Sequence, residues 1–251
     1  MPDRTNILIS GASAGLGAAM AHEFASRGRN LALCARRIEQ LEQLRAALLR
    51  AHPGIDVSVG QLDVNDHDQV FAVFRQLADE LGGLDRVIVN AGVSQGPPIG
   101  TGGFDVNLAI ANTNFVAVLA QCEAAMQMFR ADGDGHLVVI SSIAGLRGMP
   151  GLQTYSATKA AVATLAEAIR ADTLTTPIKV TTIYPGYIES DIGPPGDKKP
   201  FRVSTAKGVR AMVKAIEREP AQAKVPARPW VPVGFVLRRL PLRVIARTAK
   251  G

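Results

Sequence analysis

Short apolar runs alternate with amphipathic stretches along most of the chain. The runs have the length of buried strands, and the stretches between them repeat apolar residues at helical intervals. The runs are 6–10, 30–35, 55–62, 86–89, 135–140 and 179–184, and the longer helical patterns are 38–50, 66–81, 108–130 and 154–170. This alternation predicts a single-domain α/β fold with a doubly wound, Rossmann-like parallel sheet. The expected strand order is 3-2-1-4-5-6, with a short seventh strand.

A glycine-rich turn follows the first run and precedes a helical pattern that ends near Arg27. Glycines let the backbone approach a pyrophosphate, which then lies at the helix N-terminus. We therefore expect a dinucleotide here, although the spacing is GxxxGxG and a purely structural turn is the alternative. The candidate cofactor contacts in the turn are Gly11, Ser13, Ala14, Gly15, Leu16 and Gly17.

The second run ends at Ala35 and is followed by Arg36 and Arg37. In this fold an acidic residue there binds the ribose 2′-hydroxyl of NAD, whereas arginine accommodates a 2′-phosphate. The sequence therefore favours NADP(H) over NAD(H). In the alternative interpretation both arginines only begin the solvated helix that follows.

The later runs also end in residues suited to a ligand, and parallel sheets bind ligands at the carboxyl ends of their strands. These residues are Asp63, Val64, Asn90, Ala91, Gly92, Ser141, Ser142, Pro185 and Gly186.

Tyr155 and Lys159 stand one turn apart on a predicted helix face. An ammonium near a phenol favours the phenolate, so Lys159 is expected to lower the pKa of Tyr155. A tyrosine with such a pKa can give a proton to a carbonyl oxygen. Taken alone, the pair is equally compatible with an ordinary amphipathic helix.

Composition narrows the alternatives. Hydrophobic residues make up 47% of 251, enough for a substantial core. The two cysteines, Cys34 and Cys122, are expected to be buried thiols of a cytoplasmic protein. The four histidines lack ligand spacing, so no metal is expected. Neither a signal peptide nor an apolar run of membrane-spanning length is apparent.

The net charge of +6 lies in the last part of the chain. Residues 221–251 contain seven basic residues and no acidic ones, so the remaining 220 residues sum to 6 − 7 = −1. A nucleic-acid-binding domain would carry positive charge along a whole face, so none is expected.

Together the motifs resemble the short-chain dehydrogenase/reductase family, in its NADP-preferring type of about 250 residues. GASAGLG, Asp63, NAG, Ser142, YSATK and PG occur in the family's order, and the resemblance covers about 5–218. It implies that Tyr155 is the general acid or base, that Lys159 holds the nicotinamide ribose and that Ser142 bonds the substrate oxygen. Asn114 would hold a water that connects Lys159 to solvent; Asn107 and Asn112 fit the family's interval less well.

The resemblance also assigns cofactor contacts. Asp63 and Val64 would flank the adenine, Asn90 to Gly92 would support the cofactor, and Ile188 and Ser190 would meet the carboxamide. Candidate substrate contacts are Ser94, Met149, Leu152 and Tyr187, with 191–203 as a lid. These residues are mostly apolar, which suggests a small to medium, largely apolar ketone, aldehyde or secondary alcohol.

The chain departs from the family at two places. Ala14 stands where many NADP-preferring members carry a basic residue, so the cofactor preference rests on Arg36 and Arg37. The C-terminus lacks the usual glycine-rich end, which disfavours a tetramer; a homodimer through 108–130 and the Tyr155 helix is expected instead. Residues 1–233 would form the catalytic domain and 234–251 a basic, apolar tail.

The tail can be interpreted in two ways. A basic amphipathic segment can lie on an anionic membrane surface, but Pro241 interrupts any long helix. A helix packed on the fold or on a partner subunit is therefore favoured.

Three functional hypotheses follow. The first is an NADP(H)-dependent oxidoreductase acting on a carbonyl or alcohol. A 3-oxoacyl-thioester reductase is the second. The third is a cofactor-binding sensor without turnover, but such proteins usually lose the tyrosine or the lysine, and this chain has both.

Overall fold

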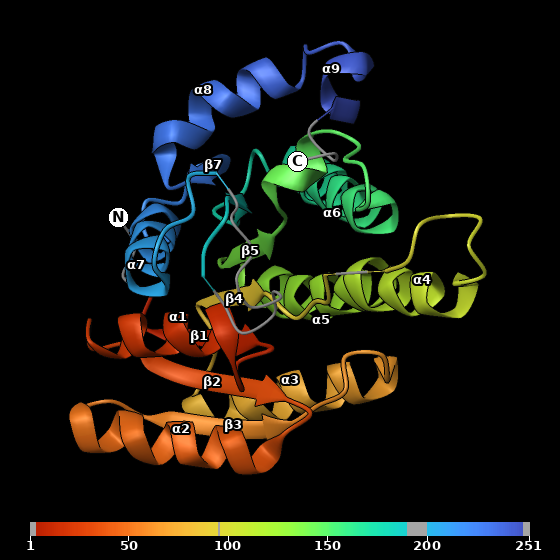
Figure 1. Ribbon diagram of the computed structural model, residues 1–251. Coiled ribbons are helices and arrows are strands. Elements are labelled where there is room, and N and C mark those ends of the chain that lie inside the picture. Colours follow the sequence, from red (N-terminus) through yellow and green to blue (C-terminus); the bar gives the residue numbers. More distant parts are fainter. Residues whose placement is uncertain (1–3, 95, 190–199, 248–251) are drawn as a thin grey trace.

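The computed structural model describes residues 4–94, 96–189 and 200–247. Within these residues a seven-stranded parallel sheet has the order β3-β2-β1-β4-β5-β6-β7 (Figure 1). The predicted fold class is therefore confirmed, including the short seventh strand. The strands are β1 (Asn6–Ser10), β2 (Asn30–Ala35), β3 (Val57–Gln61), β4 (Arg86–Val89), β5 (His136–Ile140), β6 (Lys179–Pro185) and β7 (Gln222–Val225).

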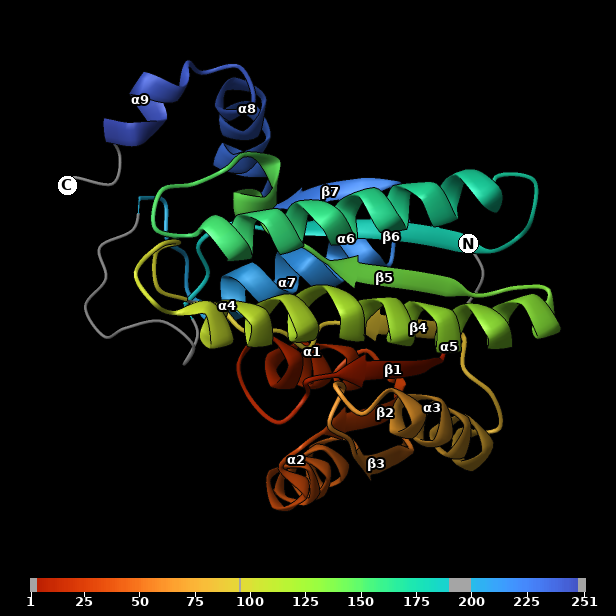
Figure 2. The same cartoon turned by 90° about the vertical axis from the view of Figure 1, so that its right-hand side faces the viewer.

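Helices cover both faces of the sheet (Figure 2). One hydrophobic core lies between the sheet and α1, α2 and α7, and the other between the sheet and α3, α5 and α6. The helices are α1 (Gly15–Ala25), α2 (Ile38–Ala51), α3 (His67–Leu81), α4 (Phe104–Ala111), η1 (Asn112–Val116), α5 (Ala117–Asp132), η2 (Ile143–Leu146), α6 (Gln153–Asp172), α7 (Thr205–Ile216), α8 (Ala227–Leu237) and α9 (Leu242–Arg247).

The central strands are buried on both sides, which explains their continuous apolar runs. In β1, Leu8 packs into one core while Ile7 and Ile9 pack into the other, and all three are 0% exposed. Successive side chains of a strand point to opposite faces, so an apolar run without alternation fits a strand covered twice.

The helix predicted over 108–130 differs from the observed one. It begins at Phe104, and the five residues of η1 form a π-helical turn between α4 and α5. Such a turn holds one extra residue and often occurs at functional sites. The regular spacing of apolar residues gives no sign of it.

Residues 227–247 form two short helices. Helix α8 packs on β7 and η2, and the boundary expected after Val233 falls inside it. Pro241 separates α8 from α9, as the sequence suggests.

Helix Phe104–Asp132, which combines α4, η1 and α5, is the one described helix long and apolar enough to cross a membrane by length and composition. It contacts α3 and α6, and 44% of its apolar window is buried. These contacts are those of a core helix.

Candidate active site

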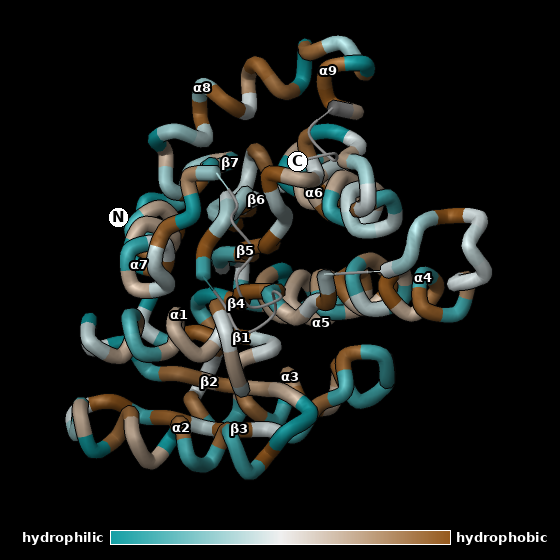
Figure 3. Tube along the Cα trace, in the orientation of Figure 1, coloured by the Kyte–Doolittle hydropathy of each residue, from teal (hydrophilic) through white to brown (hydrophobic). Residues whose placement is uncertain are grey.

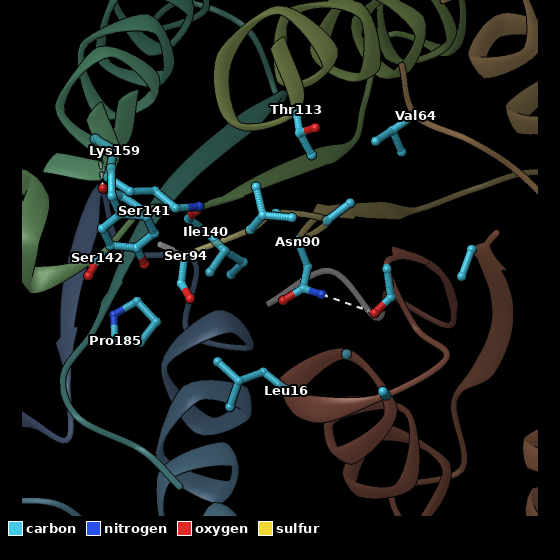
Figure 4. Close-up of a pocket in the computed structure, with 18 of the residues that line it drawn as sticks. Leu16, Val64, Asn90, Ser94, Thr113, Ile140, Ser141, Ser142, Lys159 and Pro185 are labelled. Atoms are coloured by element: carbon cyan, nitrogen blue, oxygen red, sulfur yellow. Dashed lines mark hydrogen bonds between the residues drawn. The ribbon is translucent and has the colours of Figure 1, made fainter. Parts of the chain in front are cut away.

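A cavity of about 540 Å³ opens at the carboxyl ends of the strands (Figure 4). It brings together most of the predicted site residues: Gly11, Ser13, Ala14, Leu16, Gly17, Arg36, Arg37, Asp63, Val64, Asn90, Ala91, Gly92, Ser94, Ser142, Leu152, Tyr155, Lys159, Pro185, Gly186, Tyr187 and Ile188. Gly15, Asn114 and Met149 do not line it. Ser190 and residues 191–199 of the expected lid lie outside the described residues.

The backbone of the glycine turn packs closely against the segment that follows β4, which leaves room for a ligand above it. Gly11 has a φ of 66°, and a Cβ there would lie 2.8 Å from the Cα of Ala91. A Cβ at Gly17 would meet the carbonyl oxygen of Gly11 and lie 2.9 Å from Nδ2 of Asn90. The Asn90 amide donates to the Ser10 carbonyl over 2.9 Å and so ties the turn to the neighbouring strand. Side chains at these glycines would disrupt the floor of the cavity.

Two arginines stand at one end of the cavity. Arg37 donates to Oγ of Ser13 over 3.0 and 3.3 Å, and the carbonyl of Arg36 accepts from Gln61 over 3.1 Å. The nearby Asp63 carboxylate accepts two hydrogen bonds from Asn65. Within the described part of the chain neither arginine makes an ion pair. This end is therefore cationic and open to an anionic group.

Ser142, Tyr155 and Lys159 stand at the other end, and Figure 4 shows Ser142 and Lys159 together and far from Val64. Strand β5 leads to Ser142, whose Oγ accepts from the amide of Ala144 over 3.1 Å. The preceding Ser141 donates to the carbonyl of Lys159 over 2.7 Å. That bond fixes α6 against the end of β5.

The Lys159 ammonium is buried beneath the cavity. Its Nζ donates to the carbonyl of Ile140 over 2.9 Å and lies 5.9 Å from the centre of the Tyr155 ring. Burial lowers the pKa of Lys159 to about 8, because a charge without water around it is disfavoured.

The pKa of Tyr155 is raised, which corrects the expectation that Lys159 would lower it. Burial is the largest cause; hydrogen bonding with Ser142 opposes it and Tyr187 adds to it. Removing the phenolate from water outweighs the stabilising contacts here. Tyr155 is therefore a protonated acid at neutral pH.

Asn114 is 0% exposed and lies beside Lys159 rather than on the cavity wall. Its Oδ1 accepts from the amide of Val93 over 2.8 Å, and its Nδ2 donates to the carbonyl of the same residue over 2.8 Å. A Cβ built on Gly92 would lie 3.1 Å from Oδ1 of Asn114 and 3.5 Å from Nζ of Lys159. The π-turn thus positions Asn114 next to the lysine, and the proton relay stays a prediction.

The substrate end has apolar walls from different parts of the chain. Ser94, Leu152 and Tyr187 line it, whereas Met149 does not. Behind it lies Trp230 of α8, whose ring is 5.3 Å from that of Tyr187 in an edge-to-face contact. The indole abuts Gly186 so closely that a Cβ there would overlap its Nε1. Helix α8 is therefore part of the support of this wall.

Some lining residues were not predicted: Ala35, Leu62, Asn65, Val93, Thr113, Ile140 and Ala144. Ser141, from a predicted strand end, and Arg202, from the expected lid, also line the cavity. Thr113 donates to Oδ1 of Asn65 over 3.2 Å, a contact between segments far apart in sequence. Arg202 reaches the cavity because Val203 pairs with Ile188. Several of the other unpredicted residues are sequence neighbours of predicted site residues. Their position next to a strand end could therefore have identified them.

The fold and the cavity define a dinucleotide-binding protein of the Rossmann class. Residues 5–199 match the family model described as short chain dehydrogenase, so the chain belongs to the short-chain dehydrogenase/reductase family.

Several known proteins similar to this chain are named as oxidoreductases or have been solved with a nicotinamide cofactor. An uncharacterized oxidoreductase of Mycobacterium tuberculosis is 49% identical, over 98% of each chain. A short-chain dehydrogenase of Sphingobium yanoikuyae in complex with NADPH is 27% identical, has a TM-score of 0.82 and covers 92% of this chain and 91% of that one. One from Burkholderia phymatum in complex with NAD shares the fold, with a TM-score of 0.83, 21% identity and coverage of 98% and 95%.

The lowered pKa of Lys159 predicts a pH-dependent cost to stability. Because the pKa falls from 10.5 to about 8 on folding, the full cost applies below pH 8 and disappears as pH rises to 10.5. This shift corresponds to roughly 3 kcal/mol. The free energy of unfolding of the wild type relative to Lys159→Met should rise by roughly that amount between pH 7 and pH 10.5 in urea titrations. Lys207→Met, at an exposed position on α7, is the control. A difference between wild type and Lys159→Met that stays constant with pH would contradict the assignment.

Proposed function

We propose that this protein is an NADP(H)-dependent oxidoreductase that interconverts a small to medium, largely apolar ketone or aldehyde and its alcohol. The observation that carries the proposal is the arrangement of one cavity, with Ser142, Tyr155 and Lys159 at one end and Arg36 and Arg37 at the other. The cavity therefore contains both a proton donor and a site for an anionic group.

The residues present fit a dinucleotide. A Cβ at Gly11 or Gly17 would collide with neighbouring backbone, so these two glycines keep the turn in its close packing, and the N-terminus of α1 favours a pyrophosphate. The two arginines lack a carboxylate partner in the described residues and supply charge for a 2′-phosphate. Lys159, whose Nζ lies near Gly92, would hold a hydroxyl of the nicotinamide ribose. When bound, the nicotinamide accepts or supplies a hydride.

Tyr155 gives the proton to the substrate oxygen in the reducing direction. Its raised pKa keeps the phenol protonated at neutral pH, which suits an acid. The Ser142 hydroxyl donates a hydrogen bond to the same oxygen and stabilises the charge that develops there. In the oxidising direction Tyr155 must be a phenolate, so its raised pKa favours oxidation only in alkaline solution.

The direct test has two parts. Binding of NADPH and NADH is titrated by fluorescence, and the consumption of each cofactor is then followed with a panel of apolar ketones and aldehydes. Tighter binding of NADPH with turnover of at least one apolar carbonyl compound is expected. Tight NADPH binding without turnover across a broad panel would instead support a cofactor sensor.

We also propose a homodimer through α4, α5 and α6. Leu108, Val116 and Leu119 expose 44%, 37% and 45% of their surfaces along α4, η1 and α5, which is unusual for large apolar residues on one helical stretch. Analytical ultracentrifugation should show a dimer; a monomer at micromolar concentration would refute it.

A further inference from the structure

Helices α8 and α9 leave several large apolar side chains in solvent. On α8, Trp230 and Gly234 are buried against the fold, while Val231, Phe235 and Val236 are 50%, 60% and 50% exposed. On α9, Leu242 and Val244 are 65% and 42% exposed. Both helices stand out at one end of the molecule in Figures 1 and 2, and their apolar segments are brown in Figure 3. The rest of the fold does not cover these side chains.

Exposed arginines lie on the same stretch of chain as these apolar side chains. Arg228, Arg238, Arg239 and Arg243 are exposed on the same two helices and the turn between them. The guanidinium of Arg239 lies 3.8 Å from the centre of the Phe235 ring. Residues 221–251 contain no acidic residue, so the positive charge of this segment is not offset within it. We call these four arginines and the five exposed apolar residues, Val231, Phe235, Val236, Leu242 and Val244, the α8–α9 surface.

The α8–α9 surface is held in place before any partner arrives. Arg147, which follows η2, donates to the carbonyls of Arg238 and Leu240 over 3.0 and 2.9 Å. A Cβ at Gly234 would lie 2.9 Å from Leu146, so α8 packs tightly on η2. Binding through a surface that is already ordered loses little conformational freedom.

A second copy of this chain is a poor partner for the surface. In a two-fold dimer the same patch faces itself. Here that contact would place exposed arginines against exposed arginines, with no acid in 221–251 to offset them. Apolar side chains among basic ones match a lipid surface, whose interior accepts the former and whose anionic headgroups attract the latter.

We propose that the α8–α9 surface docks on anionic membranes, with Phe235 and Leu242 entering the interfacial region and the arginines meeting the headgroups. This is peripheral binding, because α8 and α9 have 11 and 6 residues and are too short to span a bilayer. Separate variants of the arginines and of the apolar residues distinguish the electrostatic contribution from the apolar one.

The test is co-sedimentation of the full chain with vesicles of neutral phosphatidylcholine and with vesicles that also contain phosphatidylglycerol. Binding is expected to the anionic vesicles and to weaken with salt. Arg239→Gln/Arg243→Gln should lower the partition coefficient about 20- to 30-fold, since each basic side chain contributes about one kcal/mol near an anionic surface. Phe235→Ser/Leu242→Ser should lower it at least about tenfold.

Two controls remove exposed charges or an exposed leucine elsewhere on the molecule. Arg75→Gln/Arg210→Gln removes two exposed charges from α3 and α7, and Leu174→Ser removes a leucine that is 73% exposed after α6. Both should bind as the wild type does. Absence of binding to anionic vesicles, equal binding to neutral ones, or equal loss in the controls would overturn the proposal. A solution dimer that Phe235→Ser/Leu242→Ser dissociates would assign the surface to a second copy and overturn it too.

Discussion

Tyr155→Phe is expected to lower turnover by about 10²- to 10⁴-fold while NADPH still binds. The substitution removes one hydroxyl that lies in the cavity beside Ser142 and is the proton donor of the proposed reaction. General acid catalysis by a positioned side chain contributes about that factor. Little else should change, because the phenyl ring keeps its place on α6.

The measurement is steady-state consumption of NADPH together with a separate titration of cofactor binding. Tyr184→Phe is the control, because it removes the hydroxyl of a buried tyrosine that does not line the cavity. It should keep nearly full activity. Equal turnover by Tyr155→Phe and the wild type would show that Tyr155 is not the proton donor.

Arg36→Ala/Arg37→Ala is expected to weaken NADPH binding by about 100-fold or more and to change NADH binding far less. A hydrogen bond to a charged group contributes about 1.5–3 kcal/mol, and each arginine can give at least one to a 2′-phosphate. NADH lacks that phosphate, so its affinity does not depend on the two charges. The difference between the losses of NADPH and NADH affinity therefore measures the contact of the arginines with the 2′-phosphate.

Fluorescence titrations of both cofactors at two salt concentrations test this prediction. Arg50→Ala, at the other end of α2, removes an exposed arginine from the same helix and serves as the control. Equal loss of affinity for NADPH and NADH in the double variant would show that the arginines do not recognise the 2′-phosphate. The alternative, that they merely begin a solvated helix, would then hold.

Much of the fold could be predicted because each segment shows a single pattern, either apolar residues at helical intervals or a continuous apolar run. The predicted bounds of β1, β2 and β4 are the observed ones, since buried parallel strands read as uninterrupted apolar runs. The π-turn at Asn112–Val116 was not predictable, because one extra residue in a helix hardly alters the apolar pattern. The paths of α8 and α9 depend on long-range contacts such as that of Arg147 with Leu240.

The candidate site followed from a single rule, that strand ends meet at one edge of a parallel sheet. The rule brought together Ser142, Asn90 and Gly11 from different strands. It could not give the pKa of Tyr155, because burial depends on the whole fold and here outweighs the hydrogen bond with Ser142. Nor could it show that Trp230, from a helix near the C-terminus, supports the wall formed by Tyr187.

The most direct test of the central claim is transfer of deuterium from NADPH labelled at both C4 positions to an apolar ketone. Mass spectrometry of the alcohol should show one deuterium at the carbinol carbon. The rate of its formation should fall at least about 100-fold in Tyr155→Phe. Consumption of NADPH that yields no labelled alcohol, or equal labelling by Tyr155→Phe, would contradict the account.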